Sequence, residues 1–210
     1  MQETYLSGIL LAYAAFAIGL FSPGPNIMAI IGTSMANSRS SGKSLALGIA
    51  TGSFLWGTLT LLGLTSLLTF YASLMTIIKI AGAGYLFWLA FKAFKSAGKH
   101  QTQELNSIAL GDNYWAYYRR GLLIQMTNPK AALTWIAVIS LALDQAAPWW
   151  VGLSVVVGTT TLSAIGHLVY AYAFSTQTMV TAYRKARRWI EGLLGSFFTF
   201  AGYKLLSSDT

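Results

Sequence analysis

Long apolar stretches separated by short polar connectors dominate the chain. No charged residue lies between Glu3 and Arg39, or between Asp144 and Arg184. A membrane-spanning helix needs about 20 apolar residues, and both stretches are longer than that. The pattern predicts an all-α integral membrane protein with six transmembrane helices. The expected spans are residues 5–36, 44–67, 72–91, 114–143, 149–174 and 189–206.

Prolines interrupt two of these spans. Ser22-Pro23-Gly24-Pro25-Asn26 lies inside the first span, and Thr127-Asn128-Pro129-Lys130 lies inside the fourth. Proline lacks an amide N–H and ends or kinks a helix. At membrane depth such a break is tolerated only where the freed backbone is buried in protein or lines a cavity. We therefore expect spans one and four to be broken helices.

The two breaks occupy matching places in the two halves of the chain. Residues 1–95 hold three spans with the broken one first, and residues 114–210 repeat that order after a polar connector, expected to be cytoplasmic, at residues 96–113. An odd number of spans in each half makes the repeats inverted, and paired interrupted helices mark a transporter's binding site. The sequence predicts one membrane domain built from two inverted three-helix repeats.

The breaks offer a binding chemistry. Pro23, Pro25 and Pro129 should free the carbonyls of Gly19, Phe21 and Gln125, and Gly24 should permit a turn that other residues resist. Carbonyl ends of half-helices attract cations and N–H ends attract anions, so two facing breaks suit a zwitterionic amino acid. The predicted substrate-binding residues are Pro23, Gly24, Pro25, Asn26, Asn128, Pro129 and Lys130.

Several of these side chains have two interpretations. Lys130 either attracts a substrate carboxylate, or neutralises the carbonyl end of its own half-helix or bonds to Asn26. Asn26 and Asn128 either bind substrate or cap half-helices. His167, a near-neutral titrating group within a span, is a candidate for proton coupling, and the alternative is a core histidine bonded to a neighbouring helix.

Glycines at helical spacing predict close helix packing. Gly48 and Gly52 form a small-xxx-small pair in the second span, and such pairs let two helix backbones approach closely. Gly82 and Gly84 stand together in the third span and receive the same interpretation.

Composition and charge fit the membrane class. Hydrophobic residues make up 55% of the chain and charged residues 10%, against about 25% charged residues in soluble domains. The net charge of +8 comes from cations in the short connectors, including Arg184–Arg188, which we expect to face lipid headgroups rather than nucleic acid. Basic connectors lie in the cytoplasm, so both termini should lie outside it. The chain has no cysteine, and we expect no metal or cofactor.

An ordered set of motifs carries a family resemblance. The motifs are Pro23-Gly24-Pro25-Asn26, Gly48-Ile49-Ala50-Thr51-Gly52, Gly82-Ala83-Gly84-Tyr85-Leu86 and Asn128-Pro129-Lys130. With them, nearly the whole chain resembles the lysine exporter (LysE/RhtB) family. The resemblance implies a six-helix bacterial inner-membrane protein that exports amino acids or related metabolites, driven by the proton gradient. Ser53 stands where many relatives have an acid, so this chain should couple differently or act as a uniporter.

These observations favour a secondary exporter over an enzyme, which would need positioned nucleophiles, acid/base pairs or metal ligands. A passive channel and a membrane scaffold subunit are the alternatives. No Asp or Glu lies in the middle of a span, so small neutral or apolar amino acids are the expected substrates. The expected partners are that substrate and membrane lipids, with a homodimer left open by the sequence.

Overall fold

The computed structural model describes residues 2–22, 24–70, 74–98, 110–111, 113–143 and 147–207. All regular structure in these residues is helical. The helices are α1 (Gln2–Phe21), α2 (Pro25–Ala36), α3 (Arg39–Phe70), α4 (Leu74–Ala97), α5 (Tyr114–Met126), α6 (Pro129–Ala142), α7 (Trp149–Ala173) and α8 (Gln177–Ser207). Pro23 and most of the connector predicted at residues 96–113 lie outside the described residues.

Both proline segments separate helices. Pro25 opens α2 and Pro129 opens α6, each in the first helical turn. Proline suits this position because its fixed φ is helical and its missing N–H would have had no partner there. The two halves of the first broken helix are bent by 49° and those of the second by 62°.

Some of the helices, but not all, are long and apolar enough to cross a membrane. Arg39–Gly63 of α3 and Trp149–Ala173 of α7 are each long and apolar enough to cross a membrane, and the described residues give up to four candidate spans if each bent pair is one span. The protein is therefore an all-α, multi-pass membrane protein. Helices α4 and α8 occupy the expected third and sixth spans but are not among the candidates. The count of six spans in two inverted repeats stays a prediction.

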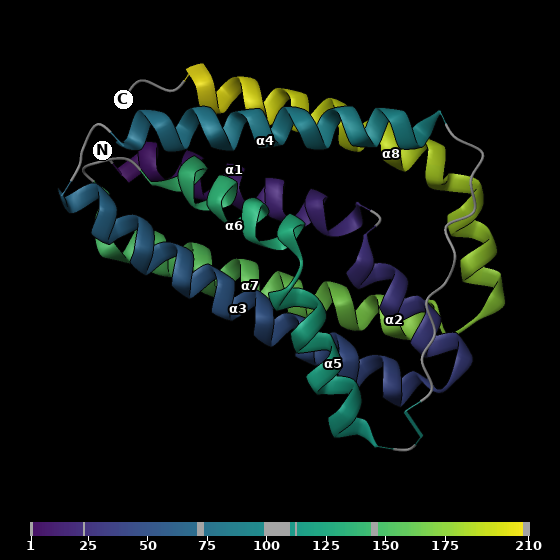
Figure 1. The fold of residues 1–210 in the computed structure, drawn as a ribbon. Helices are drawn as coiled ribbons and strands as arrows, with labels where there is room; N and C mark the ends of the chain where they lie inside the picture. Colours follow the sequence, from purple (N-terminus) through teal and green to yellow (C-terminus); the bar gives the residue numbers. More distant parts are fainter. Residues whose placement is uncertain are drawn as a thin grey trace.

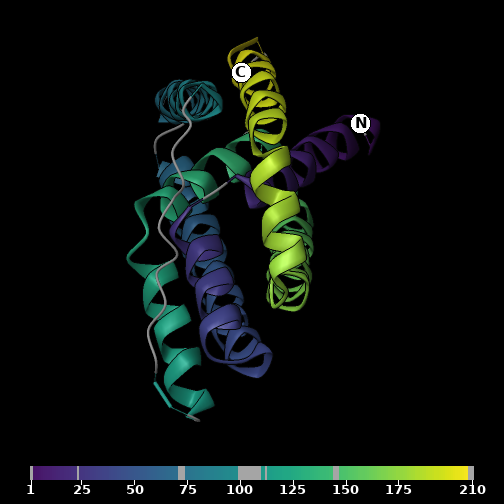
Figure 2. The ribbon, with the colours of Figure 1, turned by 90° about the vertical axis from the view of Figure 1, so that its right-hand side faces the viewer.

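The helices form two groups that share the broken helices. In the first group, α2, α5 and α7 pack on α3. In the second, α4 lies along α8 and also contacts α6, while α1 contacts α6 and α8 (Figures 1 and 2). Each broken helix thus contributes one half to each group. Contacts of α1 with α7 and of α3 with α6 join the two groups.

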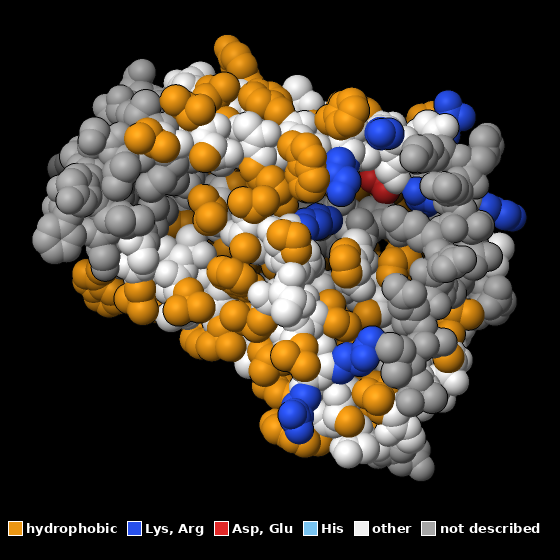
Figure 3. All heavy atoms as spheres, in the orientation of Figure 1, with side chains coloured by type: hydrophobic (Ala, Val, Ile, Leu, Met, Phe, Trp, Pro, Cys, Tyr) orange, Lys and Arg blue, Asp and Glu red, His pale blue; other side chains and the backbone are white. Residues whose placement is uncertain are grey.

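Buried side chains fill three places between these helices. One cluster includes Ile30, Leu45 and Tyr170 of the first group. Another surrounds Trp135 and contains Phe16 and Val155, and a third joins α4, α6 and α8. Hydrophobic side chains also spread over the outer face drawn in Figure 3, while Lys and Arg gather on its right-hand half. Exposed apolar residues suit a surface that contacts lipid tails.

The four glycines predicted to pack closely differ. A Cβ at Gly48 would overlap the Tyr118 carbonyl oxygen, where α3 meets α5, and one at Gly52 would lie 2.8 Å from the Gln125 side chain. A Cβ at Gly82 would lie 3.2 Å from Leu205. At Gly84 it would meet nothing within 4 Å, so no close neighbour explains that glycine.

Candidate functional site

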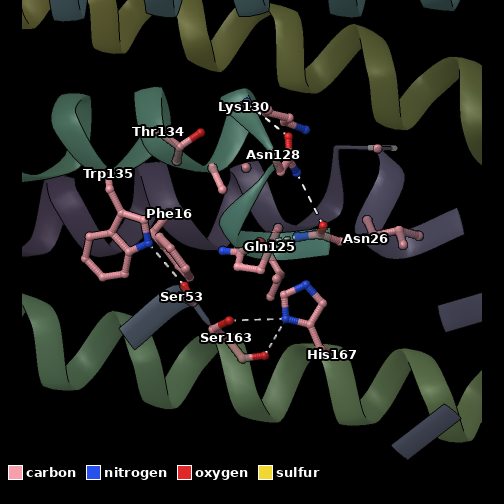
Figure 4. A pocket seen from close by; sticks show the side chains of 15 residues that line it. Phe16, Asn26, Ser53, Gln125, Asn128, Lys130, Thr134, Trp135, Ser163 and His167 are labelled. Atoms are coloured by element: carbon pink, nitrogen blue, oxygen red, sulfur yellow. Dashed lines mark hydrogen bonds between the residues drawn. The ribbon is translucent and has the colours of Figure 1, made fainter. Parts of the chain in front are cut away.

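A pocket lies where the two breaks face each other (Figure 4). It holds about 510 Å³ of atom-free space, its open mouth included. Its apolar wall includes Phe16, Leu20, Ile27 and Trp135. Its polar side chains are Asn26, Ser53, Gln125, Asn128, Lys130, Thr134, Ser163 and His167.

Three amide side chains connect the breaks across the pocket. Asn26 Nδ2 donates to Gln125 Oε1 at 2.6 Å, and Asn128 Nδ2 donates to Asn26 Oδ1 at 3.3 Å. The structure therefore brings together Asn26 and Asn128, which the sequence singled out, and adds Gln125. In the sequence, Gln125 is the one polar side chain in the apolar run from Gly121 to Met126, and that signal could have identified this third amide. The structure buries it.

The two asparagines differ in their relation to the helix ends. Asn128 Oδ1 accepts from the Lys130 backbone N–H at 3.0 Å, so Asn128 caps α6. The N-cap of α2 is Gly24, which offers no side-chain cap. Gly24 has φ −163° and ψ −179°, an extended conformation that any residue adopts. The expectation that a glycine is needed for the turn at this position was wrong.

Lys130 extends from α6 to the first break. Its Nζ donates to the Ser22 carbonyl at 3.2 Å, just beyond the end of α1. An ammonium is stabilised there because the C-terminal end of a helix carries partial negative charge. The partner is the Ser22 carbonyl of the other broken helix, rather than the carbonyl end of its own half-helix or Asn26. Tyr85 of α4 fixes the same turn of α6 by donating to the Lys130 carbonyl at 2.9 Å.

Two of the carbonyls expected to be free have donors. The Gly19 carbonyl accepts from the Ser22 backbone N–H at 3.2 Å, and the Gln125 carbonyl accepts from Trp56 Nε1 at 3.1 Å. The expectation of bare carbonyls at these residues was wrong, because buried acceptors are nearly always paired within the protein. The polar surface of the pocket is therefore made mainly by side chains.

His167 lines the pocket from α7 and is 4% exposed. Its Nδ1 lies 2.8 Å from the Ser163 carbonyl and 3.2 Å from Ser163 Oγ. A carbonyl only accepts, so Nδ1 carries the proton and a neutral ring leaves Nε2 as an acceptor. The partner is in the same helix, rather than in a neighbouring helix as the core alternative assumed. On the opposite wall Trp135 Nε1 donates to Ser53 Oγ at 3.2 Å (Figure 4).

Pro25 and Pro129 are not among the residues that line the pocket. Pro25 and Pro129 begin the second halves of the broken helices. Among the described residues, no group of three or more His, Cys, Asp or Glu could hold a metal ion. What the arrangement provides is one cation, three linked amides and an imidazole beside apolar walls, which suits binding of a small polar molecule.

Comparisons with known proteins agree on one family. Residues 17–209 match the family described as LysE type translocator. The uncharacterized membrane protein YahN of Escherichia coli K12 is 28% identical over 96% of this chain and 90% of its own length. A threonine efflux protein of Salmonella typhi is 31% identical, covering 91% of this chain and 93% of its own. An uncharacterized membrane protein of Haemophilus influenzae is 28% identical over 90% of each chain. No solved structure matches the chain.

Proposed function

Because this chain belongs to the LysE type translocator family, we propose that it exports small neutral amino acids from the cytoplasm through the pocket between its two breaks. The protein is a transporter and not an enzyme. The 31% identity to a threonine efflux protein supports an amino acid with a small side chain as the substrate. The observation that carries the proposal is the convergence of Lys130 and the three amides on one pocket.

The pocket suggests how a zwitterion would bind. Lys130 Nζ would receive the substrate carboxylate, and the oxygens of Asn26 and Gln125 would accept from its ammonium group. A short side chain would lie against Phe16 and Trp135. Since none of the residues that line the pocket is acidic, a cationic side chain would lack a partner of opposite charge.

The same proposal includes the membrane arrangement predicted from the sequence. The chain would cross the bacterial inner membrane six times as two inverted three-helix repeats, with both termini outside the cytoplasm. The Lys and Arg side chains on one side of the face in Figure 3 support this orientation. Export would be coupled to protons, and His167 is the candidate carrier within the pocket.

Flux measurements in proteoliposomes test the proposal. Purified protein should carry radiolabelled threonine or another small neutral amino acid with saturable kinetics. Lys130→Met should reduce that flux at least tenfold, because it removes the ammonium and keeps an unbranched side chain of nearly the same length. Lys204→Met is the matched control, since Lys204 is exposed in the last turn of α8. Flux that does not saturate would favour a passive pore, and equal flux in both variants would refute the role of Lys130.

Proton coupling needs a separate measurement. His167→Gln should abolish threonine movement driven by a pH gradient, while exchange of labelled for unlabelled threonine continues. Exchange requires binding and reorientation but no net proton movement, so it distinguishes loss of coupling from loss of the site. If the variant still responds to the pH gradient as the natural protein does, His167 is not the carrier.

A further inference from the structure

A chain of hydrogen bonds that begins at a backbone N–H sets the donors and acceptors around the pocket. The Lys130 backbone N–H can only donate, so the oxygen of Asn128 faces it at 3.0 Å. Asn128 Nδ2 then donates to Asn26 Oδ1, and Asn26 Nδ2 donates to Gln125 Oε1. The Gln125 amide nitrogen therefore points away from Asn26, on the side of Phe16 (Figure 4). Gln125 Nε2 is a donor for which the described residues provide no acceptor.

Ser53 supplies a second donor. The indole N–H of Trp135 can only donate, so Ser53 Oγ accepts it at 3.2 Å and keeps its own proton for another group. Within the described part of the chain Trp135 is the one hydrogen-bond partner of this hydroxyl, and Ser53 is 1% exposed. The buried Ser140, by contrast, gives its proton to the Ile136 carbonyl of its own helix at 2.7 Å. A buried hydroxyl proton without an acceptor is costly, so a group in the pocket should accept it.

Packing of α5 against α3 brings these two donors together. Gln125 lies on α3 at Gly52, where an added Cβ would be 2.8 Å from both Cβ and Cγ of Gln125. Trp56, on the same helix α3, holds the Gln125 carbonyl at 3.1 Å. Ser53 follows Gly52 in the chain, and both Ser53 and Gln125 line the pocket together with Phe16. A pair of hydrogen-bond donors therefore stands beside the apolar wall.

We propose that Ser53 and Gln125 determine which side chain the pocket accepts, by donating to a hydroxyl oxygen on the β-carbon of the substrate. The inference rests on the proposed export of small neutral amino acids and narrows it to β-hydroxy amino acids. A hydroxyl oxygen has two lone pairs, one for each donor. In such a substrate the ammonium and the hydroxyl are on adjacent carbons, so Gln125 can meet both, with Oε1 toward the ammonium and Nε2 toward the hydroxyl.

Other side chains of similar size fit the two donors less well. A side-chain carboxylate would also accept from them, but Lys130 is the one Lys or Arg among the described residues that line the pocket, and the α-carboxylate already occupies it. An apolar side chain of the same shape leaves both donors unpaired. A site built to hydrogen-bond a substrate hydroxyl rejects an analogue that lacks it for this reason.

Binding of threonine and valine to the purified protein in detergent tests the inference. The two amino acids have nearly the same shape, with a methyl group in valine where threonine has its hydroxyl. Threonine should bind about tenfold more tightly than valine, because valine leaves two donors without acceptors. Isothermal titration calorimetry gives both dissociation constants. Equal binding would overturn the inference alone, whereas binding of no small neutral amino acid would refute the proposed function and the inference with it.

Two substitutions locate the discrimination. Ser53→Ala removes one donor and should bring the affinities for threonine and valine severalfold closer together. Gln125→Met removes the other donor and should do the same. It also removes the acceptor for the ammonium, but that loss weakens both amino acids alike, so the ratio of their dissociation constants isolates the donor.

Ser140→Ala is the matched control for the serine variant. Ser140 is also buried, at 2% exposed, but does not line the pocket, so the ratio should stay as in the natural protein. A ratio unchanged in Ser53→Ala, or lowered equally in Ser140→Ala, would overturn the inference. If Ser53→Ala fails to fold, serine and alanine are compared on the natural protein, and equal binding of those two would overturn it.

Transport kinetics give a second readout that a purely structural role would not change. In Ser53→Ala the KM for threonine should rise severalfold, while the KM for valine and both maximal rates stay near those of the natural protein. A fall in the maximal rate for both amino acids, with the ratio of their KM values unchanged, would mean that Ser53 only holds Trp135 in place. That result would overturn the inference.

Discussion

The two broken helices are both interrupted at a proline but are held in different ways. The second break carries its own cap, since the Asn128 side chain accepts from the first turn of α6 and the Thr127 hydroxyl donates to the Leu123 carbonyl at 2.7 Å. The first break has no side-chain cap at Gly24, and its Ser22 carbonyl receives the Lys130 ammonium from across the pocket. The first break is therefore stabilised in part by the second.

This difference shows that two helix breaks of similar pattern need not be stabilised in equivalent ways. A ligand that draws Lys130 away removes a donor from the first break and leaves the cap of the second intact. In the proposed binding mode, the first break is therefore the half of the site that responds when substrate binds. Substitutions that affect one break without the other should expose the asymmetry.

The largest loss of stability is expected from a substitution where α5, the first half of the second broken helix, meets α3. A Cβ at Gly121 would overlap the Leu45 carbonyl oxygen, and backbone cannot shift cheaply. Gly121→Ala should cost about 3 kcal/mol, at the upper end of overpacking penalties. The midpoint of thermal unfolding in detergent should fall by several degrees. Gly84→Ala is the matched control, because its Cβ meets nothing within 4 Å. Equal midpoints in the two variants would contradict the close contact.

Loss of the Lys130 ammonium should loosen the first break selectively. Lys130→Met removes the donor to Ser22, and a hydrogen bond from a charged group is worth about 1.5–3 kcal/mol, less where water competes. Amide hydrogen exchange at residues 24–28 should accelerate about tenfold, since 1.4 kcal/mol is a factor of ten. Exchange at residues 128–132 should stay unchanged. Equal acceleration at both breaks would show that they are not independent.

The cap of the second break should make a smaller contribution. Asn128→Ala removes the acceptor for the Lys130 backbone N–H and should cost about 1 kcal/mol. Asn128→Ser keeps a capping oxygen but loses the contact with Asn26, so its unfolding midpoint should lie between those of the alanine variant and the natural protein. A serine variant as unstable as the alanine variant would assign the loss to the Asn26 contact instead.

The smallest change in stability is expected from a substitution at Gly24. Its extended backbone suits any residue, and an added Cβ would lie 3.6 Å from Lys130 Nζ, an ordinary contact. Gly24→Ala should change the free energy of unfolding by less than about 0.5 kcal/mol, as substitutions that create no cavity, clash or strain usually do. A large loss of stability would mean that this glycine is needed for its conformation, against the dihedral angles in the structure.

Local signals in the sequence were enough to place the breaks. Pro25 and Pro129 act on the residues next to them, so their effect on the helices does not depend on the rest of the fold. The contacts of the site were harder to foresee. Trp56 reaches the Gln125 carbonyl, and Lys130 reaches the Ser22 carbonyl, across 69 and 108 positions of the sequence. Such pairs depend on helix packing, which a single sequence does not specify.

Charge was the other source of error. Arg187 stands in a basic run next to an expected span, and that pattern is typical of headgroup contacts. Its neighbour four positions along, Glu191, is buried against Ser96 of α4, and the pair turns inward. The sequence contains both residues, but nothing in their spacing says on which side of α8 the lipid lies. That information comes from the packing of α4 along α8.

The division of each broken helix between two packed groups has a mechanical consequence. If one group tilts against the other, the chain must bend between α1 and α2 and between α5 and α6, since these connections join the halves of each broken helix. Gly24 and Asn128, which lie in these connections, line the pocket. A molecule bound to Lys130, Asn26 and Asn128 at once would therefore also hold the two groups together. Binding in the pocket would then limit how far the two groups tilt against each other.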